Sequence, residues 1–256
     1  MSTTLEEQGV LELSCSTNSS QVNIIAIADV HIGHPGAKIE DFIEILKRAK
    51  KQNDYVVLLG DIVDNPDEKT GLYDANTTPE QAMMKFIEIL AQHKTKILCV
   101  VSGNHEYRTK KKSGIDTLNV VCQQYKIPYT AGIAIIRLKL KHTNFDIVVG
   151  HGYSAARTLN SKVGTMTELT RVVKNADVYI VGHTHQPSIV PIASFEFNDS
   201  VKQRQSLLIT APSWLSYSIY SAQKFMPPSP RGFIKITLTV NGKISASLDL
   251  ERSVVL

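Results

Sequence analysis

The chain has 256 residues, of which 43% are hydrophobic and 20% charged, and its formal net charge at pH 7 is +4. These values are ordinary for a globular protein that buries a substantial core. No apolar run approaches the length of about 18 residues that a membrane-spanning helix needs, and the polar start of the chain lacks the features of a signal peptide. The small positive charge permits an anionic substrate without requiring one.

The cysteines and the first residues indicate where the protein works and where its folded part begins. Cys15, Cys99 and Cys122 form no CxxC pair, so the sequence supports neither a disulfide framework nor a zinc ribbon. We therefore expect a protein of the reducing cytoplasm without contact to a membrane. Residues 1–21 are polar and are expected to form a flexible tail. Residues 22–256 are expected to form a single domain.

The first half of the chain alternates between strand and helix patterns. Thr78 and Asp116 stand where they can cap the second and third helices. Alternation of this kind predicts parallel strands joined by right-handed crossovers. The apolar runs predict strands at 22–28, 55–59 and 96–101, and the helical spacing of apolar residues predicts helices at 38–51, 79–93 and 116–125.

The second half of the chain is mostly β. Asn241-Gly242 predicts a two-residue hairpin turn. A sheet covered by helices on one face and packed against a second sheet would accommodate both halves, so we expect a layered α/β sandwich. The predicted strands are 133–139, 146–149, 178–181, 189–197, 205–210, 232–240 and 244–250, with one helix at 165–174.

Five of the predicted strands are followed directly by side chains that bind metals. In open α/β sheets such side chains gather beyond the carboxyl ends of the strands. Carboxylates, an amide and imidazoles together suit divalent metal ions. In extended backbone, residues two apart would point the same way, which we expect for both D-x-H and H-x-H. The clusters are Asp29-Val30-His31, Gly60-Asp61, Gly103-Asn104-His105-Glu106, Gly150-His151-Gly152 and Gly182-His183-Thr184-His185.

This set of motifs resembles that of the calcineurin-like metallophosphoesterase superfamily, which runs D-x-H, G-D-x-x-D, G-N-H-[DE], G-H and G-H-x-H. The resemblance extends over roughly residues 22–187 and implies a four-layer α-β-β-α sandwich with two metal ions. It implies that His105 is a catalytic group, which stabilises the transition state or protonates the leaving oxygen, and that Asp64 supports catalysis by orienting a neighbour. The implied ligands are Asp29, His31, Asp61 and His185 for one ion, with Asp61 bridging to a second ion held by Asn104, His151 and His183.

The implied ligand set also indicates the metal and the chemistry. Mixed nitrogen and oxygen ligands favour Mn²⁺, Fe or Zn²⁺ over Mg²⁺, and we expect Mn²⁺, with Ni²⁺ as a further candidate. Two ions about 3.5–4 Å apart can hold a bridging hydroxide as the nucleophile and clamp the phosphoryl oxygens for in-line attack.

Basic residues beside the motifs suggest the substrate. Arg108 and the lysines at 110–112 follow His105-Glu106, and Arg157 and Lys162 follow His151. A basic rim beside a phosphoester centre suits a polyanion such as DNA or RNA. Arg108 is the first choice for substrate contact because its planar fork matches phosphate. Arg157 and Asn104 are the other expected substrate-binding residues.

We therefore expect a phosphodiesterase that acts on nucleic acid, a nuclease. It is closest in character to compact phage and bacterial phosphodiesterases and to the SbcD-type repair nucleases, whose chains are longer. A small-molecule phosphatase and a cyclic-nucleotide or nucleotide phosphodiesterase are the alternatives. Protein phosphatases are disfavoured because they carry Arg-Gly where Asn65-Pro66 stands here. A non-catalytic scaffold is the outside alternative, and the presence of every metal-ligand motif argues against it.

Overall fold

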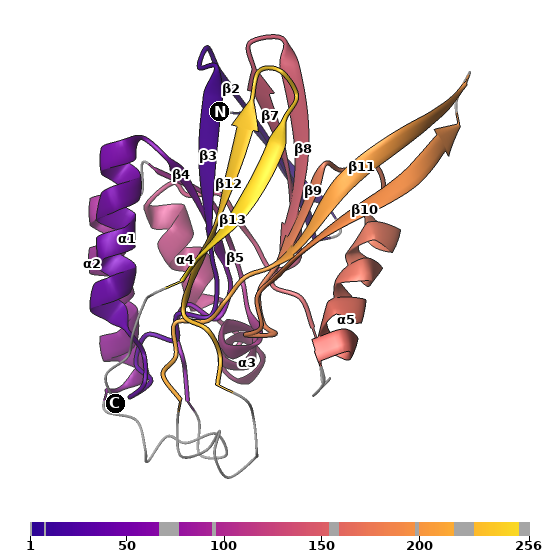
Figure 1. The fold of residues 1–256 in the computed structure, drawn as a ribbon. Coiled ribbons are helices and arrows are strands. Elements are labelled where there is room, and N and C mark those ends of the chain that lie inside the picture. Colours follow the sequence, from indigo (N-terminus) through magenta and orange to yellow (C-terminus); the bar gives the residue numbers. More distant parts are fainter. Residues whose placement is uncertain are drawn as a thin grey trace.

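The computed structural model describes residues 2–7, 9–66, 77–93, 96–153, 159–197, 200–217 and 228–250. Two β-sheets lie face to face, and helices cover the outer face of each (Figure 1). One apolar cluster fills the space between the sheets, and two others lie between a sheet and its helices. The layers therefore run α-β-β-α, which confirms the predicted sandwich.

The six-stranded sheet carries the strand–helix alternation predicted for the first half of the chain. Strands β3 to β6 are parallel, and a C-terminal hairpin, β12–β13, extends the sheet beside β3. The strand order is β13-β12-β3-β4-β5-β6, with β3 at Gln21–Ile27, β4 at Tyr55–Leu59, β5 at Ile97–Val101, β6 at Tyr129–Thr130, β12 at Gly232–Thr239 and β13 at Ile244–Leu250.

Three helices pack their apolar sides on this sheet, and their caps follow the predictions. Thr78 and Gln81 exchange hydrogen bonds between side chain and backbone at the start of the second helix. The Asp116 carboxylate accepts the Asn119 N–H at 3.0 Å. The helices are α1 at Ile39–Gln52, α2 at Pro79–His93 and α4 at Thr117–Gln124.

One helix on this side was not predicted. Helix α3, Asn104–Ser113, begins inside the G-N-H-E motif and includes the basic residues expected to form part of the rim, a segment for which no helix was predicted. Its residues are almost all polar, so they give no apolar periodicity. It begins where the Glu106 carboxylate accepts the Gly103 N–H, and it ends at Gly114, whose φ of 74° is left-handed.

The seven-stranded sheet mixes parallel and antiparallel pairs and carries helix α5, Leu159–Val172, on its outer face. The strand order in this sheet is β1-β2-β7-β8-β9-β11-β10, with β1 at Ser2–Glu7, β2 at Val10–Thr17, β7 at Ile133–Leu140, β8 at Thr143–Gly150, β9 at Val178–Val181, β10 at Ser188–Phe197 and β11 at Val201–Thr210.

The turn of the β12–β13 hairpin, in the six-stranded sheet, differs from the prediction. The Thr239 N–H donates to the Lys243 carbonyl, so the loop between them is longer than the predicted two residues.

The expectation of a flexible tail at residues 1–21 is wrong. Strand β2 pairs in parallel with β7, from Val10 opposite Ile133 onwards, and β1 pairs with β2. Leu11 and Leu13 alternate with Glu12 and Ser14, so one face of β2 joins the core between the sheets. The alternation of apolar and polar residues in β2 is short and lies within a polar stretch, so the sequence pattern did not predict this strand.

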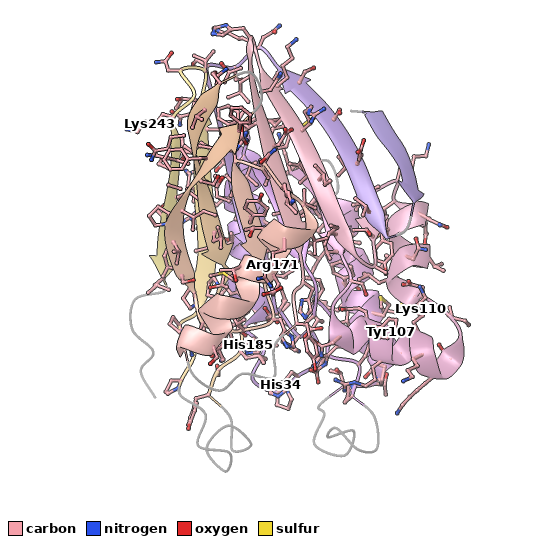
Figure 2. The ribbon with its side chains drawn as sticks, turned by 90° about the vertical axis from the view of Figure 1, so that its right-hand side faces the viewer. His34, Tyr107, Lys110, Arg171, His185 and Lys243 are labelled. Carbon is pink, nitrogen blue, oxygen red and sulfur yellow. The ribbon has the colours of Figure 1, made fainter. Side chains whose placement is uncertain are left out.

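The layers place the motif residues at one end of the molecule. His185 and His34 lie at the lower end in Figure 2, and Lys243, in the β12–β13 turn, lies near the upper end. Of the helices described, none is both long enough and apolar enough to cross a bilayer.

The burial of β2 can be tested by truncating Leu13, which is 1% exposed. We expect Leu13→Ala to lower the free energy of unfolding in urea by about 2–5 kcal/mol, because a buried leucine leaves a cavity. Glu12→Ala, on the exposed face of the same strand, is the matched control and should change it by less than about 0.5 kcal/mol. Equal effects of the two substitutions would contradict the packing of β2.

Candidate metal centre

The predicted metal-binding side chains converge beyond the ends of β3, β4, β5, β8 and β9. Within each of three groups, the candidate ligand atoms lie within 4.8 Å of one another. Two of the groups correspond to the two predicted ion sites. The groups are Asp29 with His31 and His185, Asp61 with His151 and His183, and His31 with Asp64 and His105.

Asp61 stands between the groups. Its Oδ2 lies 3.3 Å from His151 Nε2, 3.8 Å from His105 Nε2 and 3.9 Å from His31 Nε2. Burial would raise the pKa of this carboxyl, but the surrounding imidazoles hold it well below its usual range. The carboxylate is therefore ionised and placed where it can face two cations at once.

The first group is built on Asp29. Its Oδ1 lies 3.1 Å from His185 Nε2, and its Oδ2 accepts the His183 N–H at 2.9 Å. His31 Nδ1 contacts Asp64 Oδ1 at 3.0 Å, while its Nε2 is buried without a hydrogen-bond partner in the described part of the chain. A buried polar atom of this kind, 3.9 Å from Asp61 Oδ2, fits a ligand of a divalent cation.

The second group is oriented by the backbone of β4. His151 Nδ1 donates to the Leu59 carbonyl at 2.7 Å, which turns its Nε2 into the site. Asn104 Oδ1 lies 3.0 Å and His183 Nδ1 3.2 Å from that Nε2. Burial would lower the pKa of His151, but Asp61 raises it to about 10. The site thus attracts positive charge, and its donors fit a divalent ion.

Asp64 and His105 form a pair beside these groups. His105 Nδ1 donates to the Asp64 carbonyl oxygen, and its Nε2 faces Asp61. Burial would lower the pKa of His105, but the hydrogen bond with Asp64 and the charge of Asp61 outweigh it and raise the pKa to about 9. Burial would raise the pKa of the Asp64 carboxyl, but the imidazoles of His105 and His31 lower it.

The backbone at the site is unusual. A positive φ is uncommon outside glycine, with Asp, Asn and His enriched among the exceptions, and it costs about 1–3 kcal/mol at a non-glycine residue. The prediction that D-x-H and H-x-H are extended is therefore wrong: these residues lie in tight left-handed turns. The φ values are 54° at Asp29, 52° at His31, 50° at Asp61, 63° at His183 and 56° at His185.

Glu106 holds the β4 turn, a role that the sequence analysis missed. The motif pattern did point to an acidic residue here, but only the structure reveals its partners. Its buried carboxylate accepts four backbone N–H groups, those of Asp61, Ile62, Val63 and Gly103, at 2.8–3.1 Å.

Two glycines are needed for the close approach of these turns. A Cβ at Gly103 would lie 2.1 Å from Asp61 Oδ1, and one at Gly60 would lie 2.6 Å from His151 Nδ1. Neither position has room for a side chain, because the atoms it would meet are the candidate ligands and the turns that carry them.

The predicted basic rim is only partly present. Because α3 is a helix, its basic side chains point in different directions from the helix axis. Of these, only Arg108 and Lys112 lie on the same face as His105. The charge of Arg108 acts on the His105 ring. Lys110 pairs with Asp116 at 3.1 Å.

Other predicted and unpredicted residues complete the rim. Lys162 donates to the Thr184 carbonyl at 2.8 Å. Arg157 lies outside the described residues. The sequence analysis did not single out Tyr153, whose ring stacks on His183 with centroids 6.4 Å apart and whose side chain is 82% exposed. His34 also lies close, with its ring 6.5 Å from that of His31.

Comparison with known proteins agrees with this geometry. A sequence model of the calcineurin-like phosphoesterases matches residues 22–187. The chain belongs to this family. Members are phosphoester hydrolases, and the His and Asp groups of this calcineurin-like phosphoesterase could hold metal ions. The resemblance seen in the motifs is thereby confirmed. A search of curated proteins gives no match.

Solved structures that are similar to this chain have low sequence identity to it. GAP50, the anchor in the inner membrane complex of Plasmodium, has a TM-score of 0.50 and 13% identity over 90% of this chain and 84% of its own. The calcineurin-like phosphoesterase YfkN from Bacillus subtilis has a TM-score of 0.41 and 13% identity, and the match covers 91% of this chain and 90% of that one. A predicted phosphoesterase from Streptococcus pneumoniae has a TM-score of 0.40 and 14% identity, and the match covers 91% of this chain and 99% of that one.

Replacing Glu106 tests whether this carboxylate holds the turn that carries Asp61. We expect Glu106→Gln to lower the free energy of unfolding by about 2–4 kcal/mol, because the amide places N–H donors against backbone N–H donors in a buried site. The variant should also bind Mn²⁺ more weakly. Urea denaturation and metal titration measure the two effects, with Glu88→Gln on the exposed side of α2 as control. A variant as stable as wild type would remove this role from Glu106.

Proposed function

We propose that this calcineurin-like phosphoesterase is a metal-dependent phosphodiesterase that acts on nucleic acid. The observation that carries the proposal is the pair of donor groups joined at Asp61, with an exposed aromatic ring, Tyr153, stacked on the candidate ligand His183. The pair suits phosphoester cleavage, and the ring suits a substrate that carries bases.

The donor set supports two divalent ions, for which we propose Mn²⁺. Asp29, His31, Asp61 and His185 would hold one ion, and Asp61, Asn104, His151 and His183 the other. When bound, such a pair activates water and neutralises the charge of the phosphoryl oxygens.

His105 is the group of this chain best placed to move a proton. Burial would lower the pKa of its ring, but the hydrogen bond with Asp64 and the charge of Asp61 raise it, and Asp64 fixes the ring so that Nε2 faces the centre. A protonated Nε2 in that position can donate to the oxygen that leaves phosphorus. Asp64 is then a positioning residue, since it holds both His105 and His31.

The rim supports a substrate that extends beyond one phosphate group. Tyr153 turns one face of its ring to His183 and leaves 82% of its side chain exposed, as a base-stacking residue would. Arg108 lies one helical turn after His105 and can grip a phosphate with its fork.

A phosphodiesterase for small molecules is the second candidate. It is favoured by the contacts that hold two of the expected rim cations: Lys110 pairs with Asp116, and Lys162 donates to the Thr184 carbonyl. Because these two lysines are engaged within the protein, fewer rim cations can contact the phosphates of a long polyanion.

The first experiment is hydrolysis of labelled single-stranded and duplex DNA by the Mn²⁺-loaded protein, with Asp61→Asn as the control for contaminating nucleases. We expect wild type to cleave and the variant to lose at least about 100-fold in rate, because the shared carboxylate is gone. The rate at low substrate should fall steeply between 50 and 200 mM salt, as is general for phosphate-backbone contacts. Hydrolysis of bis-nitrophenyl phosphate without DNA cleavage would instead support the second candidate.

Tyr153 provides a sharper test of base stacking. We expect Tyr153→Ala to raise KM for an oligonucleotide about tenfold with little change in kcat, because a stacked base loses its platform. Tyr153→Phe keeps the ring and should behave like wild type. An unchanged KM in the alanine variant would show that the bases are not held there.

A further inference from the structure

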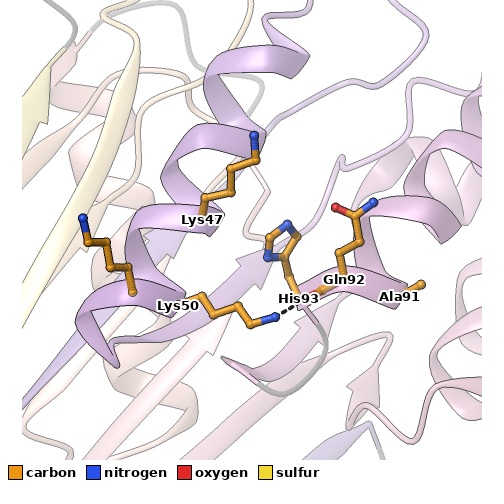
Figure 3. A pocket seen from close by; sticks show the side chains of 6 residues that line it. Lys47, Lys50, Ala91, Gln92 and His93 are labelled. Atoms are coloured by element: carbon orange, nitrogen blue, oxygen red, sulfur yellow. Dashed lines mark hydrogen bonds between the residues drawn. The ribbon is translucent and has the colours of Figure 1, made fainter.

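A hollow separate from the metal centre lies between the C-terminal ends of α1 and α2. Its volume is about 580 Å³. Cations from α1 face an imidazole from α2 across it (Figure 3). The lining residues are Lys47, Lys50, Lys51, Ala91, Gln92 and His93.

His93 is the unusual member of this lining. Its side chain is only 4% exposed, yet neither ring nitrogen has a hydrogen-bond partner within the described residues. Figure 3 shows the ring standing between Lys47 and Gln92. Buried polar atoms are nearly always hydrogen-bonded, so two unpartnered nitrogens in a ring that lines a hollow point to a ligand.

The lysines have structural roles that explain only part of the arrangement. Lys50 and Lys51 in the last turn of α1 offset the negative end of the helix dipole, and Lys50 also donates to the Gln92 carbonyl at 3.1 Å. Lys47 pairs with Glu44 on the exposed side of α1 at 3.9 Å. None of these contacts provides a partner for the ring of His93.

We propose that this hollow binds a small anion of the phosphate class, such as phosphate, pyrophosphate or a phosphomonoester, through the three lysine ammonium groups and the His93 ring. An ammonium group offers three donors, and the imidazole one or two, so together they can surround several phosphate oxygens.

The charges of α1 favour a small anion over a nucleic acid that also reaches the metal centre. The first half of α1 carries Glu40, Asp41 and Glu44, and its cations lie in the second half. The first half is the part nearer the metal-centre end, since α1 follows β3 and ends just before β4 begins. A polyanion passing from one site to the other along α1 would meet these carboxylates.

The hollow is distinct from the centre in position as well as in charge. Its lysines precede the start of β4 at Tyr55, and His93 precedes the start of β5 at Ile97. The candidate metal ligands instead follow the ends of these strands. The proposal therefore does not depend on the reaction catalysed at the other end.

Anion binding should be linked to the protonation of His93. Burial first, and then the charges of Lys50 and Lys47, lower the pKa of this ring, so it is neutral at pH 7. A bound anion would offset both effects and raise the pKa. The affinity for sulfate, whose charge is constant between pH 5 and 8, should therefore increase as the pH falls.

The experiment is a titration of the full chain, freed of metal by a chelator, with pyrophosphate and with sulfate. Calorimetry gives the affinity, and NMR of the His93 ring protons gives its pKa. We expect saturable binding, a rise in the His93 pKa, and at least tenfold weaker binding in Lys47→Gln/Lys51→Gln. Lys243→Gln, an exposed lysine in the β12–β13 turn, should bind like wild type. His93→Gln, which keeps one donor, should bind more weakly and lose the pH dependence.

Three results would overturn the proposal. One is no saturable binding by wild type at millimolar anion. Another is equal affinity of wild type and the double lysine variant. The third is binding that is lost in Asp61→Asn, since the anion would then occupy the metal centre. Hydrolysis of bis-nitrophenyl phosphate by the double lysine variant should equal that of wild type, so failure of this proposal and failure of the proposed phosphodiesterase activity can be told apart.

Discussion

The buried carboxylate of Asp61 is the constraint on which the rest of the site depends. An ionised carboxylate removed from water is stable only with positive charge and hydrogen-bond donors around it. The imidazoles of His105 and His151, from two separate turns, supply the charge, and the backbone N–H of His105 donates to Oδ1 at 2.9 Å. Glu106 fixes the turn itself by accepting the N–H groups that a tight bend would leave without partners. The folded chain thus keeps a buried, ionised carboxylate at a position where a pair of cations can neutralise its charge.

The sandwich provides the rigidity that this arrangement needs. The two sheets share an apolar core that reaches the strand ends, so the turns have little freedom to relax. Left-handed backbone at five of the candidate ligands is tolerated because the strands on either side hold it. Glycines at 60 and 103 let the turns approach closely enough for Asp61 to meet His151.

Local sequence signals predicted those parts of the structure that are locally determined. Helix α2 was predicted from Pro79 to His93, its observed bounds, because Thr78 caps an amphipathic stretch. The convergence of the ligands followed from their position after strands. Helix α3 was missed because its stabilising contact, Glu106 with the β4 turn, joins segments far apart in sequence. Strand β2 was missed for the same reason, since its partner β7 is distant, and the stacking of Tyr153 on His183 leaves no trace in either segment.

The parallel pairing of β2 with β7 has a consequence for synthesis of the chain. Val10 lies opposite Ile133, so β2 leaves the ribosome about 120 residues before its neighbour exists. At about 5–20 residues per second, this strand waits about 6–25 s with one edge unpaired. During that interval the β1–β2 hairpin covers its other edge. The remaining edge is a place where a chaperone, or another nascent chain, can pair with the polypeptide before its own strand arrives.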